Sequence, residues 1–247
     1  MVKFYNLKAF MDRKFRIKTT NQKGRIKERH YSVFSVVFSV LHRKLMNGVS
    51  KKILTFLGNS MIKLLDLRTR FYRNKGYEIT QITSFDNRFD SFSREVSKEF
   101  GIISLRNSKY LNWKYIQKPY TQYNIYTAIN NNKLLGYIVF RIDEYEGVRK
   151  GIILDVLTYP ERLDVLKGLI VKTLDYFSKA KSEYVTCLVT YPPFRKLLRR
   201  YGFFQAKNPE PFMIANWEGV FSRDYVQNIE NWYITLGDSD GDAWAIT

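Results

Sequence analysis

The chain has 247 residues and a formal net charge of +18. Its hydrophobic content of 45% and aromatic content of 16% are typical of a protein with a hydrophobic core, and they exclude general disorder. The longest apolar run, residues 31–41, is interrupted by serines and is much shorter than the roughly 20 residues that span a membrane. The first residues do not form a secretory signal, and the single cysteine, Cys187, cannot form an internal disulfide, so we expect a cytoplasmic protein.

The basic residues are concentrated in the first part of the chain. Residues 1–75 contain 19 Lys and Arg against 3 Asp and Glu, whereas residues 76–247 contain 22 against 20. The composition changes near Gly76, and a glycine after basic residues is typical of a helix end. We therefore predict a basic helical lead-in or linker over residues 1–75, followed by one mixed α/β domain over residues 76–247.

The lead-in has the pattern of an amphipathic helix. We favour a linker helix that packs on a neighbouring domain, or on a second copy of the chain, through residues 31–67. The alternatives are a surface for an anionic membrane or for a nucleic-acid backbone, but nothing in the sequence selects a nucleic acid. Residues 33–41 fit either a helix or a strand. The apolar stripe consists of Val49, Ile53, Leu57, Met61, Leu64 and Leu67.

The domain opens with two helices and a run of strands. Aromatic residues at helical spacing predict a helix over 85–100, with Ser84 as its N-cap and Gly101 as its end. A shorter helix is expected over 108–116. Strands are expected over 123–129, 134–142 and 151–157, and the Asn-rich residues 130–133 predict a hairpin turn. These three strands should form an antiparallel meander.

The next elements decide the fold class. Apolar residues at helical spacing predict a helix over 162–179, between the strand at 151–157 and a further strand at 184–189. A strand–helix–strand unit is a right-handed crossover, so these two strands should be parallel. A short helix over 194–201 and closing strands at 212–217 and 232–236 follow. The sequence therefore predicts an α/β fold with a mixed central sheet and helices on both faces.

This order of elements, with its residues, resembles the GCN5-related N-acetyltransferase superfamily. The resemblance covers about Thr80 to Thr247, and the segments FDNRFDSF, RNSKYLNWKYIQKPY, LLGYIVFR and WYITLGDSD resemble the second domain of proteins that join two such folds by a basic helical linker. It implies transfer of an acyl group from acetyl-CoA, or another acyl-CoA, to an amine acceptor. In such a protein the first domain would precede Met1.

The resemblance also implies where the donor would bind. In the family, the strand equivalent to 151–157 pairs with pantetheine, and the start of the following helix donates backbone N–H groups to the pyrophosphate, as helix N-termini do for anions. The chain departs from the family pattern at two positions. Leu166 stands where the family loop has its first glycine, and Leu198 stands where the family has the tyrosine that acts as the acid. The residues that the resemblance assigns to the donor are Val156, Leu157, Arg162, Leu166, Lys167, Gly168 and Leu169.

Asp155 is the candidate catalytic residue, because a carboxylate within an apolar strand can act as a general base. The alternative is a side chain that only accepts backbone hydrogen bonds at the strand. The aromatic residues Tyr110, Trp113 and Tyr115 would line an acceptor pocket or belong to the core. No metal site is predicted, and residues 238–242 fit a polar turn better than a calcium loop.

Two functions remain open from the sequence. The first is an N-acyltransferase. The second is a catalytically degenerate domain of the same fold, which would serve acceptor recognition or pack on a catalytic partner domain. The two departures from the family loop and from its tyrosine motivate the second.

Overall fold

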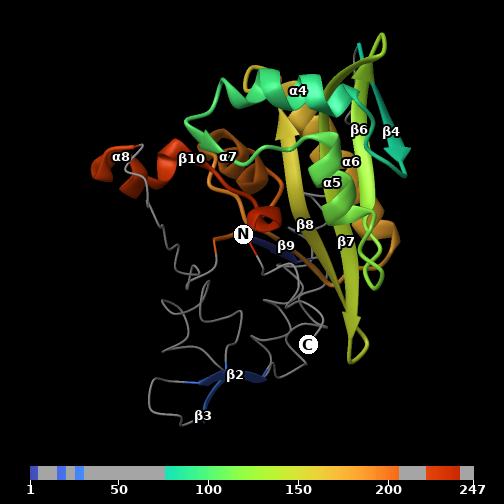
Figure 1. Cartoon of the computed structure of the whole chain (residues 1–247). Helices are drawn as coiled ribbons and strands as arrows, with labels where there is room; N and C mark the ends of the chain where they lie inside the picture. The colour runs from blue at the N-terminus through green and yellow to red at the C-terminus, as the bar shows by residue number, and fades with distance from the viewer. Residues whose placement is uncertain (5–15, 21–25, 31–75, 206–220, 240–247) are drawn as a thin grey trace.

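The structure is a computed structural model, and it describes residues 1–4, 16–20, 26–30, 76–205 and 221–239 (Figure 1). The predictions for residues 33–41, 49–67 and 212–217 lie outside this part of the chain. Within the predicted lead-in, the described residues form three strands, β1 (Val2–Phe4), β2 (Arg16–Thr20) and β3 (Ile26–His30).

A six-stranded mixed sheet forms the centre of the domain, in the order β1-β9-β8-β7-β6-β4. The predicted meander is confirmed, because β6, β7 and β8 pair antiparallel in sequence. Asn131 and Asn132 make the first hairpin turn with φ of 45° and 64°, a region that asparagine tolerates better than most residues. The strands are β4 (Glu78–Ile82), β6 (Asn124–Asn130), β7 (Lys133–Tyr145), β8 (Val148–Thr158) and β9 (Tyr184–Cys187).

The crossover between β8 and β9 is also confirmed. Helix α6 (Leu163–Lys179) links the two strands, which pair in parallel from Lys150 opposite Tyr184 to Ile153 opposite Cys187. Gly151 lets this helix approach the sheet, because a Cβ at that position would lie 2.8 Å from the Phe177 ring.

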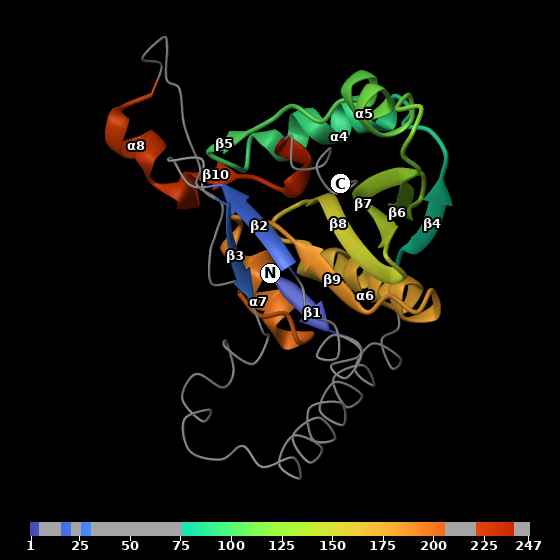
Figure 2. The ribbon, with the colours of Figure 1, turned by 90° about the horizontal axis from the view of Figure 1, so that it is seen from below.

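Helices cover both faces of the sheet (Figure 2). Helix α6 and helix α7 (Pro192–Arg200) pack on one face, and their apolar residues form one core cluster with Phe140, Ile153 and Val156. Helix α4 (Arg88–Ser97) and helix α5 (Ser108–Tyr115) cover the other face, where a second cluster includes Tyr137 and Leu157. The predicted α/β class with helices on both faces is therefore confirmed.

The first predicted helix begins later than expected. Asn87, not Ser84, precedes its first residue, Arg88. The cause is a tertiary contact: the Asn112 side chain accepts a hydrogen bond from the Phe85 backbone N–H at 3.0 Å and donates one to the Phe85 carbonyl at 2.7 Å. These two bonds hold Phe85 in the approach to the helix instead of in its first turn.

The predicted strand at 232–236 does not join the central sheet, so that part of the prediction is wrong. Strand β10 (Trp232–Tyr233) pairs in parallel with β5 (Ile102–Ile103), and Thr235 forms an isolated antiparallel bridge with Val189. A short 3-10 helix, η2 (Leu236–Asp238), follows. The chain reaches this segment through α8 (Arg223–Gln227) and the 3-10 helix η1 (Ile229–Asn231).

Both edge strands of the sheet were missed. β4 pairs with β6, and β1 pairs with β9, both antiparallel. All five side chains of β4 are exposed or half-buried, as expected of an edge strand, and its sequence EITQI therefore carries little apolar periodicity. Among the described residues, no helix is both long and apolar enough to cross a bilayer.

Candidate functional site

The parallel strands β8 and β9 separate beyond Ile153 and Cys187. Val139 of β7 pairs with Asp155, whereas its neighbour Phe140 pairs with Ile153, so Leu154 is an extra residue in β8. Such a bulge bends the strand that contains it. Residues 154–158 continue along β7 without β9 beside them, and we call the space between these residues and Val189 and Thr190 the fork.

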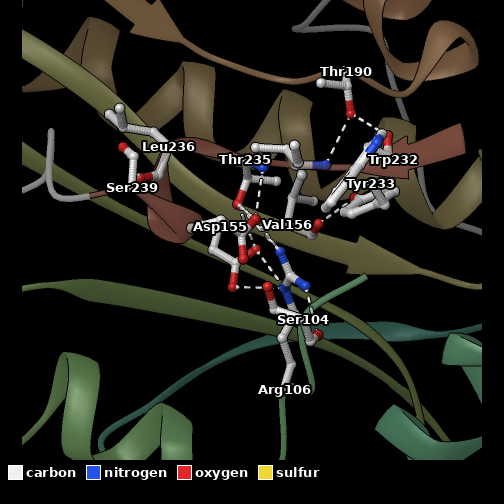
Figure 3. A network of polar contacts seen from close by, with 12 residues as sticks. Ser104, Arg106, Asp155, Val156, Thr190, Trp232, Tyr233, Thr235, Leu236 and Ser239 are labelled. Atoms are coloured by element: carbon white, nitrogen blue, oxygen red, sulfur yellow. Dashed lines mark hydrogen bonds and ion pairs between the residues drawn. The ribbon is translucent and has the colours of Figure 1, made fainter. Parts of the chain in front are cut away.

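A segment near the C-terminal end of the described chain crosses the fork (Figure 3). On the β9 side, the Thr190 backbone N–H donates to the Ile234 carbonyl at 3.0 Å, and the Thr190 hydroxyl accepts from the Ile234 N–H at 2.9 Å. On the β8 side, the Tyr233 hydroxyl donates to the Val156 carbonyl oxygen. Residues 232–238 are therefore bonded to both arms, and we call them the crossing segment.

Tyr233 is enclosed where it meets β8. Its ring centroid lies 4.5 Å from that of Phe100 and 5.6 Å from that of Tyr191, and the Arg106 guanidinium lies 5.5 Å from it. Burial raises the pKa of Tyr233 well above its usual value, so the hydroxyl keeps its proton at physiological pH. One backbone acceptor of the fork is thus already used by the chain itself.

Asp155 lies in a buried network beside the crossing segment. Arg106 Nε donates to Asp155 Oδ1 at 3.1 Å and to Oδ2 at 3.2 Å, and the two residues are only 1% and 2% exposed. The same guanidinium contacts Asp238 Oδ2 at 2.5 Å and donates to the Ser104 carbonyl at 2.9 Å. Burial lowers the pKa of Arg106, but the two carboxylates outweigh burial and hold it well above its usual value.

Both oxygens of Asp155 accept further hydrogen bonds. Tyr137 donates its hydroxyl to Oδ2 at 2.8 Å, and Thr235 donates its hydroxyl to Oδ1 at 3.1 Å. The partners are side chains, not the backbone groups that the second interpretation of Asp155 assumed. A general base needs a free lone pair that faces the substrate. The contacts of Asp155 are those of a carboxylate that holds other residues in place, and its catalytic role stays a prediction.

The start of α6, where the resemblance places the pyrophosphate of the acyl donor, carries a negative charge. Arg162, the residue before α6, donates to both carboxylate oxygens of Asp164 in the first turn of the helix at 2.8 Å. The hydrogen bond from Arg162 lowers the pKa of Asp164, which therefore carries a negative charge at the helix start. Leu166 is buried in the core, and its backbone N–H already donates to the Arg162 carbonyl. A pyrophosphate would meet a carboxylate here.

The other predicted donor residues lie in the core or at its edge. Val156, Leu157 and Leu169 are buried, Gly168 is buried in α6, and Lys167 is half-buried. Among their backbone groups, the Val156 carbonyl accepts the hydrogen bond of the Tyr233 hydroxyl. Val156 and Leu157 lie in β8 beside the fork, and Asp164 places a carboxylate at the helix start, so the binding of CoA by these residues stays a prediction.

The remaining sequence candidates divide between core and surface. Leu198, at the position of the family's acid, is buried in the core, and Cys187 is buried in β9. Tyr115 is buried, Tyr110 is half-buried, and Trp113 is exposed. The Tyr115 hydroxyl has no hydrogen-bond partner among the described residues. No group of three metal-binding side chains occurs in the described ranges.

Sequence comparisons leave the chain without a match. No protein-family model matches it. No curated protein matches it either.

Solved structures of acetyltransferases are similar to the chain over a little more than half of its length. An aminoglycoside acetyltransferase from an uncultured soil metagenomic sample, in complex with trehalose, is 16% identical, with a TM-score of 0.41, over 57% of this chain and 96% of that chain. The ribosomal-protein-alanine N-acetyltransferase of Brucella melitensis is 14% identical, with a TM-score of 0.42, over 56% and 98%. A predicted acetyltransferase of Clostridium acetobutylicum, solved with acetyl-CoA, is 15% identical, with a TM-score of 0.41, over 56% and 96%.

Proposed function

We propose that the chain is an N-acyltransferase, which transfers an acyl group from acetyl-CoA, or another acyl-CoA, to an amine acceptor. The observation that supports this function is the course of β8: the bulge at Leu154 separates its last residues from β9, and α6 begins shortly after them. A strand that has left its partner offers free backbone groups to an extended ligand.

The proposed reaction forms a carbon–nitrogen bond and breaks a carbon–sulfur bond. The amine nitrogen attacks the thioester carbonyl carbon, the carbon–sulfur bond breaks so that CoA leaves as a thiolate, and the proton lost by the nitrogen ends on that sulfur, which gives an amide and free CoA thiol. Alignment of two bound reactants supplies most of the acceleration in such a reaction. In this chain the alignment would come from the backbone of residues 154–158, which the network of Arg106 and Asp155 holds against β7.

A second candidate function is a catalytically degenerate domain of the same fold, which serves acceptor recognition or packs on a catalytic partner domain. Two observations favour it. Tyr233 occupies the Val156 carbonyl, which an amide of a donor would otherwise use. Asp164 also brings a negative charge to the helix start, where the donor's pyrophosphate would have to bind.

Acetyl-CoA binding separates the two candidates. Isothermal titration should compare the intact chain with Tyr233→Phe, which keeps the ring but frees the Val156 carbonyl. The acyltransferase proposal expects binding by the intact chain and about tenfold tighter binding by Tyr233→Phe, since one competing hydrogen bond is lost. Tyr145→Phe, at an exposed tyrosine of β7, is the matched control and should bind like the intact chain.

The opposite result is equally definite. If none of the three proteins gives heat or a thermal shift at millimolar acetyl-CoA, the acyltransferase proposal is wrong and the second candidate stands. A thermal shift is informative because a ligand that binds only the folded protein raises its midpoint of unfolding.

A further inference from the structure

Helix α5 presents an aromatic and basic surface on the outside of the domain. Its inner side is buried through Leu111 and Tyr115, while Trp113 is 61% exposed on the outer side. Ile116, three residues further along, is 39% exposed, and Tyr120 in the following turn is 93% exposed. Exposed apolar side chains that form a contiguous patch larger than a few hundred Å² typically mark an interaction site. Figure 2 shows α5 on the face of the sheet opposite α6.

Lysines surround these apolar side chains. Lys109 is exposed on α5, and Lys114 extends its ammonium group to 5.9 Å from the Tyr110 ring and 6.0 Å from the Tyr115 ring. We call Lys109, Trp113, Lys114, Ile116 and Tyr120 the α5 surface. The apolar stems of such lysines lie along aromatic rings while their charges stay in water.

Basic residues predominate in the sequence around this surface, although two of them, Arg106 and Arg141, are buried in ion pairs. Between Glu99 and Asp143 the sequence contains six Lys or Arg and no acidic residue, although the predicted domain as a whole is almost balanced. Three carboxylates lie near α5: Asp90 of α4 accepts a hydrogen bond from the Ser108 N–H at the helix start, and Asp155 and Asp238 add to burial in raising the pKa of Tyr110 and Tyr115. The lysines of the α5 surface lie further along the helix.

We propose that the α5 surface binds the surface of an anionic lipid bilayer. Tryptophan and tyrosine concentrate at the headgroup level of membranes, where one side of the ring is apolar and the other wet, and lysine adds attraction to anionic headgroups. Ile116 would enter the boundary of the acyl chains. This role is separate from acyl transfer and from the predicted lead-in, because it uses only residues of α5 and the turn that follows.

A nucleic acid fits this surface less well. Single-stranded nucleic acids stack their bases on aromatic rings and pair their phosphates with cations, and an aliphatic side chain such as Ile116 adds little there. Arginine, a frequent phosphate partner, is also absent from the surface, because Arg106 is buried in the network with Asp155.

Vesicle co-sedimentation of the full chain tests the proposal. Vesicles of phosphatidylcholine alone should be compared with vesicles that also contain phosphatidylglycerol, at low and high salt. The double variant Trp113→Ala with Tyr120→Ser should bind the mixed vesicles about tenfold more weakly than the intact chain, and Lys109→Ala with Lys114→Ala should bind them more weakly than the intact chain at low salt but not at high salt. Tyr145→Ala, an equally exposed aromatic outside the surface at 63%, should change nothing.

Three results would overturn the proposal. Equal binding by the Trp113/Tyr120 variant and by Tyr145→Ala would show that the α5 surface is not the lipid contact. No binding of the intact chain to any vesicle would exclude it directly. A single-stranded oligonucleotide could also displace the vesicles. If it binds the intact chain but not the Trp113/Tyr120 variant, the surface belongs to nucleic acid.

Fluorescence of Trp113 provides a second measurement. Its emission, identified by comparison with Trp113→Phe, should shift to the blue on mixed vesicles.

Discussion

Arg106 joins two parts of the chain that the sequence keeps far apart: its Nε lies 3.1 Å from Asp155 Oδ1 in β8, and its Nη2 lies 2.5 Å from Asp238 Oδ2 in η2. The charges are buried or nearly so, and removal of one member leaves the others without compensation. This guanidinium therefore ties the crossing segment to the central sheet.

Arg106→Ala should lower the free energy of unfolding by about 3–5 kcal/mol, because it leaves buried carboxylates unpaired. Chemical denaturation followed by circular dichroism measures it. Arg88→Ala is the matched control: its ion pair with Asp86 is half-exposed, so that variant should cost less than about 1 kcal/mol. Similar losses for both arginines would contradict the assigned role of Arg106.

Gly151→Ala tests the packing of α6 on the sheet. The new Cβ would lie 2.8 Å from the Phe177 ring, so the helix must shift, at a cost of about 1–3 kcal/mol. The double variant Gly151→Ala with Phe177→Leu should be more stable than the sum of the two single changes predicts, since the smaller side chain relieves the contact. If the unfolding free energies lost by the two single variants add up to the loss of the double variant, the contact between position 151 and Phe177 does not limit the packing of α6.

Local patterns were enough to predict the meander and the crossover. The hairpin at Asn131 and Asn132, the helix over 163–179 and the parallel pairing of β8 with β9 each follow from periodicity or turn residues within a short window. The same patterns could not show what crosses the fork. The partners of Tyr233 and Thr235 in β8 lie 77 and 80 residues away in the sequence, and no local signal connects them.

Arg106 was missed for the same reason, although one signal pointed to it. Asp155 lies in an apolar strand, and a buried carboxylate needs a cation or several donors. Arg106 follows Ile102, Ile103 and Leu105, an unusually apolar setting for an arginine. A search for a cation in an apolar stretch would therefore have proposed this pair, but not the participation of Asp238.

Cys187 should be inert in the folded protein. Burial raises its pKa to about 12, although the nearby N-terminal amine opposes the shift. Alkylation by iodoacetamide at pH 8 should therefore be negligible in the native state and rapid in denaturant, measured by mass spectrometry. Because the folded pKa is raised, the stabilisation from this protonated thiol is complete below the unfolded pKa and is lost as the pH rises from about 9 to about 12. Rapid native labelling would contradict the buried position.

Two substitutions at the start of α6 should have opposite consequences. Leu166→Gly places a glycine where the resemblance to the acetyltransferase superfamily expects one, but it removes a buried side chain and places glycine within a helix, so it should cost about 3–5 kcal/mol and not improve acetyl-CoA binding. Asp164→Ser removes only a half-exposed ion pair, so its cost should stay below about 1 kcal/mol.

Asp164→Ser also removes negative charge from the helix N-terminus and leaves Arg162 available to a phosphate. If the chain binds acetyl-CoA at α6, this variant should bind it several-fold more tightly than the intact chain in isothermal titration, and added salt should reduce the gain. Asp175→Ser is the control, because its partner Lys179 lies in the last turn of the same helix. An equal effect of the two serine variants would show that the gain reflects overall charge, and the helix start would then not be the donor site.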